Sequence, residues 1–452
     1  MKTLNINVNK QLLKKIPIAL VYRWGVIPLE KNKSGHIVVG FLDPENLECL
    51  DNLHVIFSEV IEPVQLTTAE FQELVQMNYG FGSQNDSANI VQFVESLMIK
   101  AVELRASDIH FESIEQSVTL RLRIDGILKE LPLLEELKER YVEIVSHIKI
   151  SSQMNIVEKR RPQDGRFSFN IKNEKYDVRV STLPTQFGEN LNLRILHRNM
   201  SLQGLKELGM AEKTKQQIES LINKPTGLFL VTGPTGSGKT TTLYSCLSQL
   251  DSSRKKIITL EEPIEYNLRN ITQTQIQPKL DYTFSKGLRA ILRQDPDVMM
   301  VGEMRDQETA ELAIRASFTG HFVFSTLHTN DAVSAITRLI DMGVEPYLIS
   351  SALTAVLSQR LVRQICIACS GTKKENCPFC LGDGFYERTG IFEVLVISDE
   401  MKPWISEKLP EKEWKVRLKN MGYQTFWDDG LNKVRDRITS IEELKRVVNE
   451  EV

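Results

Sequence analysis

Four short apolar runs between residues 228 and 327 have the pattern of strands that are buried on both faces. The runs cover 228–232, 256–260, 298–301 and 321–327, and their apolar residues are mostly consecutive. A helical pattern follows the first run, from residue 241 to residue 250. Buried strands of this kind alternate with helices in parallel α/β sheets. We therefore expect an α/β domain over residues 206–360.

Residues 89–205 have a different pattern, a helix followed by alternating strands. Apolar residues three and four apart predict the helix; they are Ile90, Val91, Val94, Leu97, Met98 and Ala101. Apolar and polar residues then alternate over 118–125 and 127–131, which predicts a hairpin with one face in water. Further strand-like segments lie at 165–171, 176–181 and 190–196. We expect this region to form an α+β domain.

Shorter patterns surround these two domains. A strand at 37–42 and a helix at 45–53 indicate a small mixed module over residues 1–79. Residues 80–88 are rich in Gly, Ser and Asn and are expected to be a linker. Residues 361–395 hold a cysteine cluster, and the pattern of 396–452 is largely helical. A chain of 452 residues has room for about three domains with cores of their own.

Composition and charge narrow the class of protein. The chain has 41% hydrophobic and 25% charged residues, which is typical of soluble globular proteins. Its formal net charge of −3 argues against a dominant nucleic-acid surface, although a local basic groove would not show in that sum. No apolar stretch reaches the ~18 residues that span a bilayer, and residues 1–7 lack the apolar core of a signal peptide. We expect a cytosolic protein whose contact with a membrane goes through a partner.

The segment from Gly233 to Thr240 fits the phosphate-binding pattern G-x-x-x-x-G-K-[ST]. An ordinary glycine turn is the alternative, but a strand-like run precedes the segment and a helical pattern follows it, as a phosphate loop requires. Glycines let backbone N–H groups point at a phosphate, Lys239 supplies a positive charge, and the Thr240 hydroxyl suits Mg²⁺. The sequence thus predicts a site for a nucleoside triphosphate with Mg²⁺. The predicted residues are Gly233, Pro234, Thr235, Gly236, Ser237, Gly238, Lys239, Thr240 and Thr241.

Polar residues follow the other three apolar runs. Glu261 and Glu262 come after the second run, Glu303 after the third and His328 after the fourth. One acidic residue after one strand is as often a solvated turn, but the carboxyl ends of parallel strands meet at the ligand-binding edge of an α/β sheet. Three such strands behind a phosphate loop predict a catalytic edge. Glu303 is suited to polarise the attacking water or to hold a water on Mg²⁺.

Four of the six cysteines form the pattern C-x2-C-x7-C-x2-C; they are Cys366, Cys369, Cys377 and Cys380. Two thiolate pairs at this spacing can close on one ion, and four thiolates satisfy the tetrahedral preference of zinc without an open position for chemistry. In a reducing cytosol we therefore expect a structural zinc site. An iron–sulfur site or a redox disulfide is the alternative. Cys49 and Cys246 have no partner pattern and are expected to be buried thiols.

Taken together, these motifs resemble the ATPases of type II secretion and type IV pilus assembly, a superfamily of general secretion pathway protein E-like motors. The resemblance covers roughly residues 90–395 and lies in the phosphate loop, an acidic box, the segment around Glu303, a histidine box and two segments of the preceding domain. In that order, the matching segments are 233–242, 259–266, 288–306, 319–331, 106–112 and 161–166. The tetracysteine insert resembles that of assembly motors, because retraction motors usually lack it.

The resemblance implies a cytoplasmic hexameric ring of RecA-like P-loop ATPase domains. In each chain a small N-terminal docking module would come first, and a PAS-like α+β domain would then close on the nucleotide. The tetracysteine zinc insert and the helical C-terminus would follow the ATPase domain. The resemblance also implies that Lys239 and Thr240 bind phosphate and Mg²⁺ and that Glu303 is the catalytic carboxylate.

Further site residues are implied at matching positions. Glu262 would assist the metal or its water, although it stands where the acidic box of the family usually has aspartate. His328 would sense the γ-phosphate, with a purely structural role as the alternative. Four arginines would reach the phosphates, or would each form a surface ion pair instead; they are Arg179, Arg194, Arg289 and Arg293.

The function implied by the resemblance is a motor that hydrolyses ATP to power type II secretion, in which a pseudopilus is assembled and proteins are exported across the outer membrane. The expected partners are an inner-membrane platform protein and a membrane adaptor with a cytoplasmic domain, which would hold the motor at the inner membrane. A type IV pilus assembly motor is the alternative, and the short N-terminal module favours secretion. A nucleic-acid translocase is the distant alternative. The acidic balance argues against it, so no nucleic acid is expected as a partner.

Overall fold

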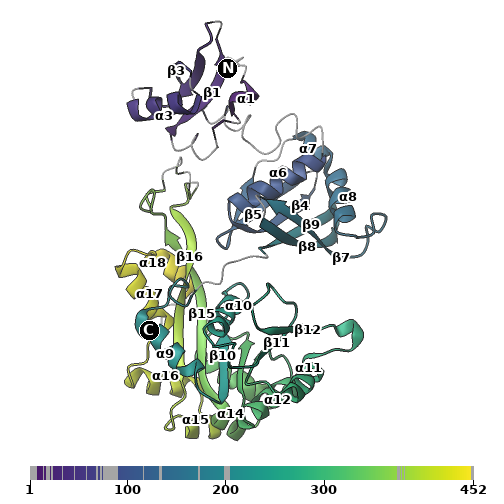
Figure 1. The fold of residues 1–452 in the computed structure, drawn as a ribbon, viewed down its shortest axis with the longest axis vertical. Helices are drawn as coiled ribbons and strands as arrows, with labels where there is room; N and C mark the ends of the chain where they lie inside the picture. Colours follow the sequence, from purple (N-terminus) through teal and green to yellow (C-terminus); the bar gives the residue numbers. More distant parts are fainter. Residues whose placement is uncertain are drawn as a thin grey trace. The chain divides into compact units, whose positions relative to one another are not determined.

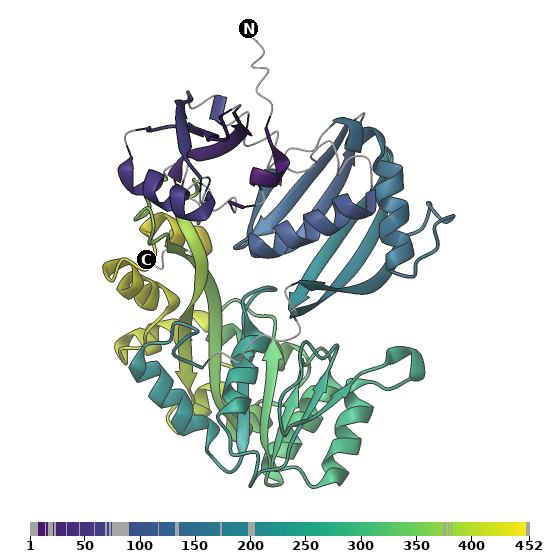
Figure 2. The same ribbon diagram turned by 45° about the horizontal axis from the view of Figure 1, so that its top comes forward.

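The structure of the chain is a computed structural model, which Figures 1 and 2 show in two views. It describes residues 8–448 except for 14, 17–20, 22–23, 33, 45, 58, 68–69, 72–73, 75–89, 116, 132–134, 172–173, 198–203, 374–376, 378 and 381. The chain divides into unit 1, which is Met1–His197 with Cys366–Tyr386, and unit 2, which is Arg198–Ile365 with Glu387–Val452. Within the described ranges, no helix is long and apolar enough to cross a membrane.

Unit 2 is built on a seven-stranded sheet in the order β12-β11-β13-β14-β10-β15-β16 (Figure 1). The pairs from β12 to β15 along this order are parallel. The strands are β10 (Gly227–Thr232), β11 (Ile257–Glu261), β12 (Thr272–Gln275), β13 (Val298–Val301), β14 (Phe322–Leu327), β15 (Leu353–Ile365) and β16 (Phe385–Val396). The four apolar runs of the sequence correspond to β10, β11, β13 and β14, so the prediction of an α/β sheet is confirmed.

Helices cover both faces of this sheet because successive residues of a strand point to opposite sides. In β11, Ile257 packs in the same core as α10, whereas Ile258 packs in the same core as α11. The helices of unit 2 are α9 (Glu212–Ile222), α10 (Lys239–Ser248), α11 (Phe284–Ile291), α12 (Gln307–Phe318), α13 (Ala332–Asp341), α14 (Pro346–Ala352), α15 (Lys402–Ser406), α16 (Glu411–Asn420), α17 (Phe426–Arg435) and α18 (Ile441–Val447), with 3-10 turns η1 (Pro278–Leu280) and η2 (Leu292–Gln294). The helical C-terminus is confirmed, and α10 begins at Lys239, earlier than the apolar pattern indicated.

The larger part of unit 1 is an antiparallel six-stranded sheet in the order β6-β5-β4-β9-β8-β7. Helices α6 and α8 contact one another and cover one face of this sheet (Figure 2). The predicted hairpin is the antiparallel pair β5 and β6; burial alternates along β5, as the sequence predicts, but not along β6. The elements are α6 (Ile90–Glu103), β4 (Ala106–Ile114), β5 (Ser117–Ile124), β6 (Ile127–Leu131), α7 (Glu135–Glu139), α8 (Tyr141–Ser151), β7 (Gln163–Ile171), β8 (Glu174–Thr185) and β9 (Gly188–His197). The α+β prediction is confirmed, and the predicted linker 80–88 lies outside the described residues.

The N-terminal part of unit 1 is a small sheet in the order β1-β2-β3. Strands β1 and β2 are antiparallel, and β2 and β3 are parallel. The elements are α1 (Lys10–Leu13), β1 (Val26–Lys31), β2 (Ile37–Phe41), α3 (Leu47–Phe57) and β3 (Ile61–Gln65). The strand expected at 37–42 is β2. The helix expected at 45–53 is α3, which continues to Phe57 because that side chain still packs in the core of the module.

The cysteine segment Cys366–Tyr386 groups with unit 1 although it connects two strands of unit 2. Within unit 1, Lys129 Nζ of β6 lies 3.1 Å from Asp383 Oδ2. The Arg105 guanidinium lies 3.7 Å from the centroid of the Tyr386 ring, a close cation–π contact. The predicted insert, 361–395, therefore contains the ends of β15 and β16 as well as the cysteines.

Candidate functional site

The phosphate loop connects β10 to α10, so the strand–loop–helix context of the motif is present. Gly233, Gly236 and Gly238 have φ angles of 146°, 79° and 87°, which residues with side chains rarely adopt. A Cβ atom on Gly233 would lie 2.4 Å from the Gln359 carbonyl oxygen, and one on Gly238 would lie 2.9 Å from Gln359 Nε2. Gln359 belongs to β15 and accepts a hydrogen bond from Thr242 Oγ1 at 2.5 Å. The adjacent strand thus supports the loop, and the positions of Gly233 and Gly238 have room only for glycine.

The loop has the donors that a phosphate group requires. Ser237 Oγ is buried and has no hydrogen-bond partner among the residues that the structure describes, so it can donate to a ligand. Lys239 Nζ donates to the carbonyl oxygens of Gly233 at 2.8 Å and Pro234 at 3.1 Å, which holds the ammonium against the loop. The first N–H groups of α10 have no acceptor within the helix and form an anion site. These groups fit nucleotide phosphates, and the Thr240 hydroxyl at the same helix start is a candidate Mg²⁺ ligand.

The Lys239 ammonium is largely shielded from water. Only 9% of the residue is exposed. Burial lowers the pKa of its ammonium, and the Glu303 carboxylate opposes this shift. A charge with so little water around it interacts strongly with an anionic ligand, because the screening is weak.

Lys239→Ala is expected to lower the affinity for ATP by about ten- to a hundredfold, since it removes a charge-assisted contact to the phosphates. The measurement is equilibrium binding of a fluorescent ATP analogue. Lys213→Ala, at an exposed position of α9, is the matched control and should bind normally. Unchanged binding by Lys239→Ala would contradict the assignment of the loop.

Glu303, Glu262 and His328 come together around Arg305. Arg305 Nη2 donates to Glu303 Oε1, and Arg305 Nη1 lies 3.7 Å from Glu262 Oε2. His328 Nε2 lies 3.6 Å from Glu303 Oε2. The cause is topological, because β11, β13 and β14 are parallel neighbours and the residues after their carboxyl ends share one edge. The expected acidic edge exists in unit 2, while the roles of its members stay predictions.

Arg305 is the cation that holds Glu303 in this structure, and His328 is not. Burial and the Lys239 charge lower the pKa of His328, whereas Glu303 opposes them. The imidazole is therefore mainly neutral at pH 7. Its distance to Glu303 also exceeds that of a hydrogen bond. A neutral imidazole so close to the edge remains available to donate a hydrogen bond to a ligand.

Arg305 has no role among the predictions from the sequence. This arginine stands two residues after Glu303, and side chains two residues apart in extended backbone point to the same side. Its side chain is 65% exposed, so it contacts both carboxylates from the solvent side. The spacing was the available signal, but spacing alone does not distinguish such a pair from two solvated charges.

Arg289 and Arg293 lie one helical turn apart in unit 2, on α11 and η2. Arg289 Nη2 lies 2.9 Å from Glu308 Oε1, and both side chains are about half exposed. This contact is the surface ion pair that stood as the alternative for Arg289, and such pairs stabilise little. A long exposed side chain can still turn to a ligand, so the reach of both arginines to the phosphates stays a prediction.

Arg179 and Arg194 belong to unit 1, where they are register partners on β8 and β9. Arg194 Nε donates to Asp108 Oδ1 at 2.9 Å, and its side chain is half exposed. Two arginines side by side on one sheet form a positive surface that suits phosphates. Their contact with a nucleotide bound to unit 2 stays a prediction.

The four cysteines of the predicted zinc site lie together and are buried. All four Sγ atoms lie within 4.8 Å of one another; the pairs Cys366–Cys377 and Cys369–Cys380 are each separated by 3.6 Å. Zinc–sulfur bonds of about 2.3 Å in a tetrahedron place the sulfurs about 3.8 Å apart, whereas a disulfide needs about 2.05 Å. The Gly384 N–H also donates to Cys380 Sγ at 3.3 Å, which suits a thiolate. The donor set and its spacing fit zinc.

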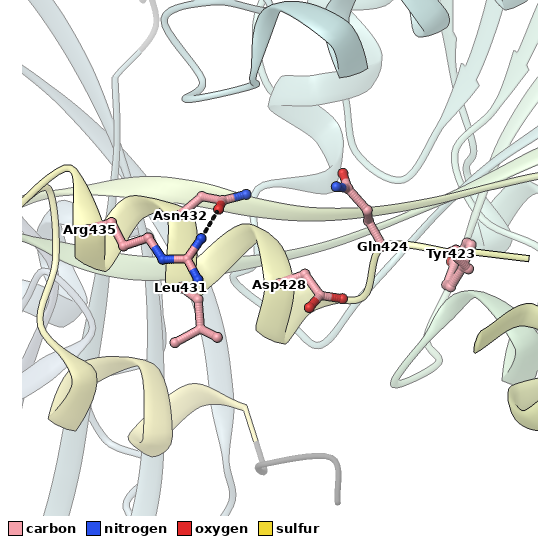
Figure 3. Close-up of a pocket in the computed structure, with 7 residues that line it drawn as sticks. Tyr423, Gln424, Asp428, Leu431, Asn432 and Arg435 are labelled. Carbon is pink, nitrogen blue, oxygen red and sulfur yellow. Dashed lines mark hydrogen bonds between the residues drawn. The ribbon is translucent and has the colours of Figure 1, made fainter. Parts of the chain in front are cut away.

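Two hollows lie among the C-terminal helices rather than at the phosphate loop. The smaller, about 340 Å³, is lined by α17 and the residues before it; Figure 3 shows Arg435 donating to Asn432 there, at 3.3 Å. The larger, about 650 Å³, lies beside α16, where Lys415 Nζ is 3.1 Å from Asp331 Oδ2. Nothing in the described part of the chain shows what fills either hollow, and neither enters the proposed chemistry.

Comparison with known proteins shows which family the chain resembles. Residues 83–446 match the model of the family described as Type II/IV secretion system protein, and residues 4–85 match the MshEN domain. A Pseudomonas aeruginosa protein named Type II secretion system protein E is 45% identical, over 81% of this chain and 77% of that protein. A Vibrio cholerae protein named Type II secretion system ATPase E is 38% identical, over 98% of each chain.

Solved structures of related proteins also match this chain. The crystal structure of the pilus retraction motor PilT with bound ADP has a TM-score of 0.53 and 29% identity, and the match covers 78% of this chain and 96% of that chain. The Legionella pneumophila ATPase DotB has a TM-score of 0.60 at 22% identity, with 78% of this chain and 94% of that chain covered, and shows a shared fold.

Proposed function

The chain belongs to the Type II/IV secretion system protein family, and we propose that it is the motor that powers a type II secretion system by hydrolysing ATP. The observation that carries the proposal is that one parallel sheet of unit 2 carries both a phosphate loop, after β10, and an acidic edge, after β11 and β13. The family match includes both this ATPase domain and the α+β domain before it.

The chemistry is divided among a few residues of unit 2. The loop N–H groups, Lys239 and Ser237 bind the phosphates. Thr240 would hold Mg²⁺, which neutralises charge on the phosphates when it is bound. Glu303 orients the attacking water and accepts its proton. Glu262 would position a water on the metal; its longer side chain, compared with the aspartate of the family, lets it do so from a greater distance.

The force-producing step involves the α+β domain. In the proposed cycle this domain closes on bound ATP, and Arg179 and Arg194 reach the phosphates. Hydrolysis removes the charge that attracts them, so the domain reopens; the nucleotide thereby biases a two-state element. Arg289 and Arg293 would approach the phosphates from α11 and η2. Six chains are proposed to form a ring in the cytoplasm, as the family resemblance implies.

The proposed partners lie at the inner membrane. An inner-membrane platform protein would receive the force and assemble a pseudopilus, and a membrane adaptor with a cytoplasmic domain would hold the motor there. The N-terminal module, which matches the MshEN domain, is the candidate docking part. Relatives named for type II secretion, one of them matching 98% of this chain, favour secretion over pilus assembly.

A pull-down with Glu303→Gln tests the proposal, since this variant should hold ATP without turning it over. Tagged protein is recovered from native-host membranes with ATP present, and bound proteins are identified by mass spectrometry. The expected result is a type II secretion platform and its adaptor. The double variant Lys239→Ala with Glu303→Gln is the matched control, because it lacks the ATP-held state and should recover less of both.

The other outcomes separate the alternatives. Recovery of pilus assembly proteins instead would move the motor to a type IV pilus with the same chemistry. Recovery of nucleic acid, with ATP hydrolysis stimulated by DNA at low salt, would support a translocase and contradict the proposal.

A further inference from the structure

Tyr244 makes a buried contact that links the phosphate-loop helix to the acidic box. It lies on α10, which begins at Lys239, and is fully buried. Its hydroxyl donates to Glu261 Oε2 at the end of β11. Its oxygen also accepts from the Glu265 N–H at 3.4 Å. The hydroxyl therefore contacts both flanks of the turn that carries Glu262.

The Glu261 carboxylate is enclosed by hydrogen-bond donors from three elements. Besides Tyr244 on α10, Thr259 Oγ1 of β11 donates to Glu261 Oε1 at 2.5 Å, and Gln273 Nε2 of β12 donates to the same oxygen at 3.1 Å. Glu261 is only 3% exposed. A buried carboxylate is stable only when donors surround it, and here the strands and the helix supply them.

Strand alternation explains why these groups meet. Thr259 and Glu261 are two residues apart and face the same side of β11, which is the side covered by α10. Gln273 is the register partner of Thr259 on β12 and so faces that side too. Glu262 follows the strand end and lies in the open, within 3.7 Å of Arg305 Nη1. Two adjacent glutamates are thus divided into a buried one and an open one.

We propose that Tyr244 is a positioning residue for ATP hydrolysis: through Glu261 it fixes the acidic box against the phosphate-loop helix and sets the place of Glu262. Tyr244 is fully buried and its hydroxyl is engaged by Glu261 and Glu265, so its proposed effect on the reaction is indirect. Glu261 acts as the anchor of the box, because its oxygens are engaged by Tyr244, Thr259 and Gln273. This inference rests on the proposed role of Glu262 in the reaction.

Burial and the neighbouring Glu261 raise the pKa of Tyr244. The phenol therefore keeps its proton and remains a hydrogen-bond donor across the physiological pH range. Tyr266 packs edge-on against it, with ring centroids 4.6 Å apart. Removal of the Tyr244 hydroxyl would leave both rings in place and take away its contacts with the box and a long one, at 3.5 Å, with Gln273 Nε2.

Tyr244→Phe tests the inference. A hydrogen bond to a charged group is lost, so kcat is expected to fall about tenfold, while KM and the affinity for ATP stay within about twofold. Tyr347→Phe, at an exposed position of α14, is the control for loss of a tyrosine hydroxyl and should keep kcat. Wild-type kcat in Tyr244→Phe, or a loss of ATP binding, would overturn the proposal, because positioning through the box leaves the phosphate loop intact.

A second variant separates positioning from instability and from direct catalysis. Glu261→Gln keeps an oxygen for Tyr244 but loses the carboxylate, and it should show the same fall in kcat at unchanged KM. If Tyr244 acts through Glu261, the double variant is no slower than the slower single variant, whereas independent effects would multiply. A different outcome is that Glu261→Gln is as inactive as Glu303→Gln while Tyr244→Phe has normal activity. Glu261 itself would then be the reacting carboxylate, and the inference would be overturned. Wild-type protein without ATP hydrolysis would instead defeat the proposed function.

Discussion

Glu303→Gln is expected to bind ATP with normal affinity and to hydrolyse it at least about a hundredfold more slowly, since a positioned general base contributes roughly 10²–10⁴-fold. The amide keeps the size of the carboxylate, so the site stays filled. It cannot accept the proton of the attacking water, and it loses the charge that Arg305 contacts. Single-turnover phosphate release and equilibrium ATP binding on the same sample separate the two quantities.

The control for this experiment is a glutamate with no place in the chemistry. Glu219→Gln on α9 removes a partner of Lys215 at the surface and should leave turnover unchanged. Wild-type turnover by Glu303→Gln would remove Glu303 from the mechanism. A loss of ATP affinity as large as that of Lys239→Ala would instead show that Glu303 acts on ground-state binding.

The sheet and the phosphate loop could be predicted because their signals are local. Continuous apolar runs that alternate with helical patterns specify buried parallel strands, and β10, β11, β13 and β14 formed where the sequence placed them. The glycine pattern also marks the positions in the loop where a side chain does not fit, since a Cβ atom on Gly233 or Gly238 would collide with Gln359. The place of Glu303 at the ligand-binding edge could be predicted because the carboxyl ends of parallel strands meet at one edge of the sheet.

The contacts between elements could not be predicted in the same way. Glu261 and Glu262 are chemically identical neighbours, and only the register of β11 with β12 shows which of them is enclosed. The donor from Tyr244 comes from a helix 17 positions earlier in the chain. Likewise, the contact of Lys129 with Asp383 spans hundreds of residues, and no pattern in the sequence marks it.

The start of α10 could be predicted only in part. The apolar pattern begins at Thr241, but the helix begins at Lys239 because the Gly238 backbone, at φ 87°, turns directly into it. Apolar periodicity reports the buried face of a helix and not its capping residues. The two residues gained are those that carry the charge and the candidate Mg²⁺ ligand.

Cys366→Ser is expected to reduce bound zinc from about one per chain to nearly none, because structural zinc sites need all four ligands. Cys366 follows directly after β15, and the segment that it closes rests on four buried sulfurs with one half-buried tyrosine, Tyr386. So small a core cannot hold its fold without a crosslink or a metal. We expect limited proteolysis to cut the variant between residues 366 and 386. Metal analysis by mass spectrometry gives the zinc content.

The nucleotide site is expected to stay intact in Cys366→Ser, so the substitution should affect the zinc segment without affecting ATP binding. Strand β15 pairs with β10 beside the phosphate loop, and Arg363 Nη2 lies 2.9 Å from the buried Glu443 of α18, so the strand is fixed before it reaches the cysteines. ATP binding is therefore expected to stay within about twofold of wild type, since no phosphate contact is removed. Cys246→Ala, at a buried thiol outside the cluster, is the control and should keep its zinc. Iron in the wild-type protein, or a disulfide among the four cysteines, would contradict zinc, and loss of ATP binding in Cys366→Ser would show that the insert supports the phosphate loop through β15.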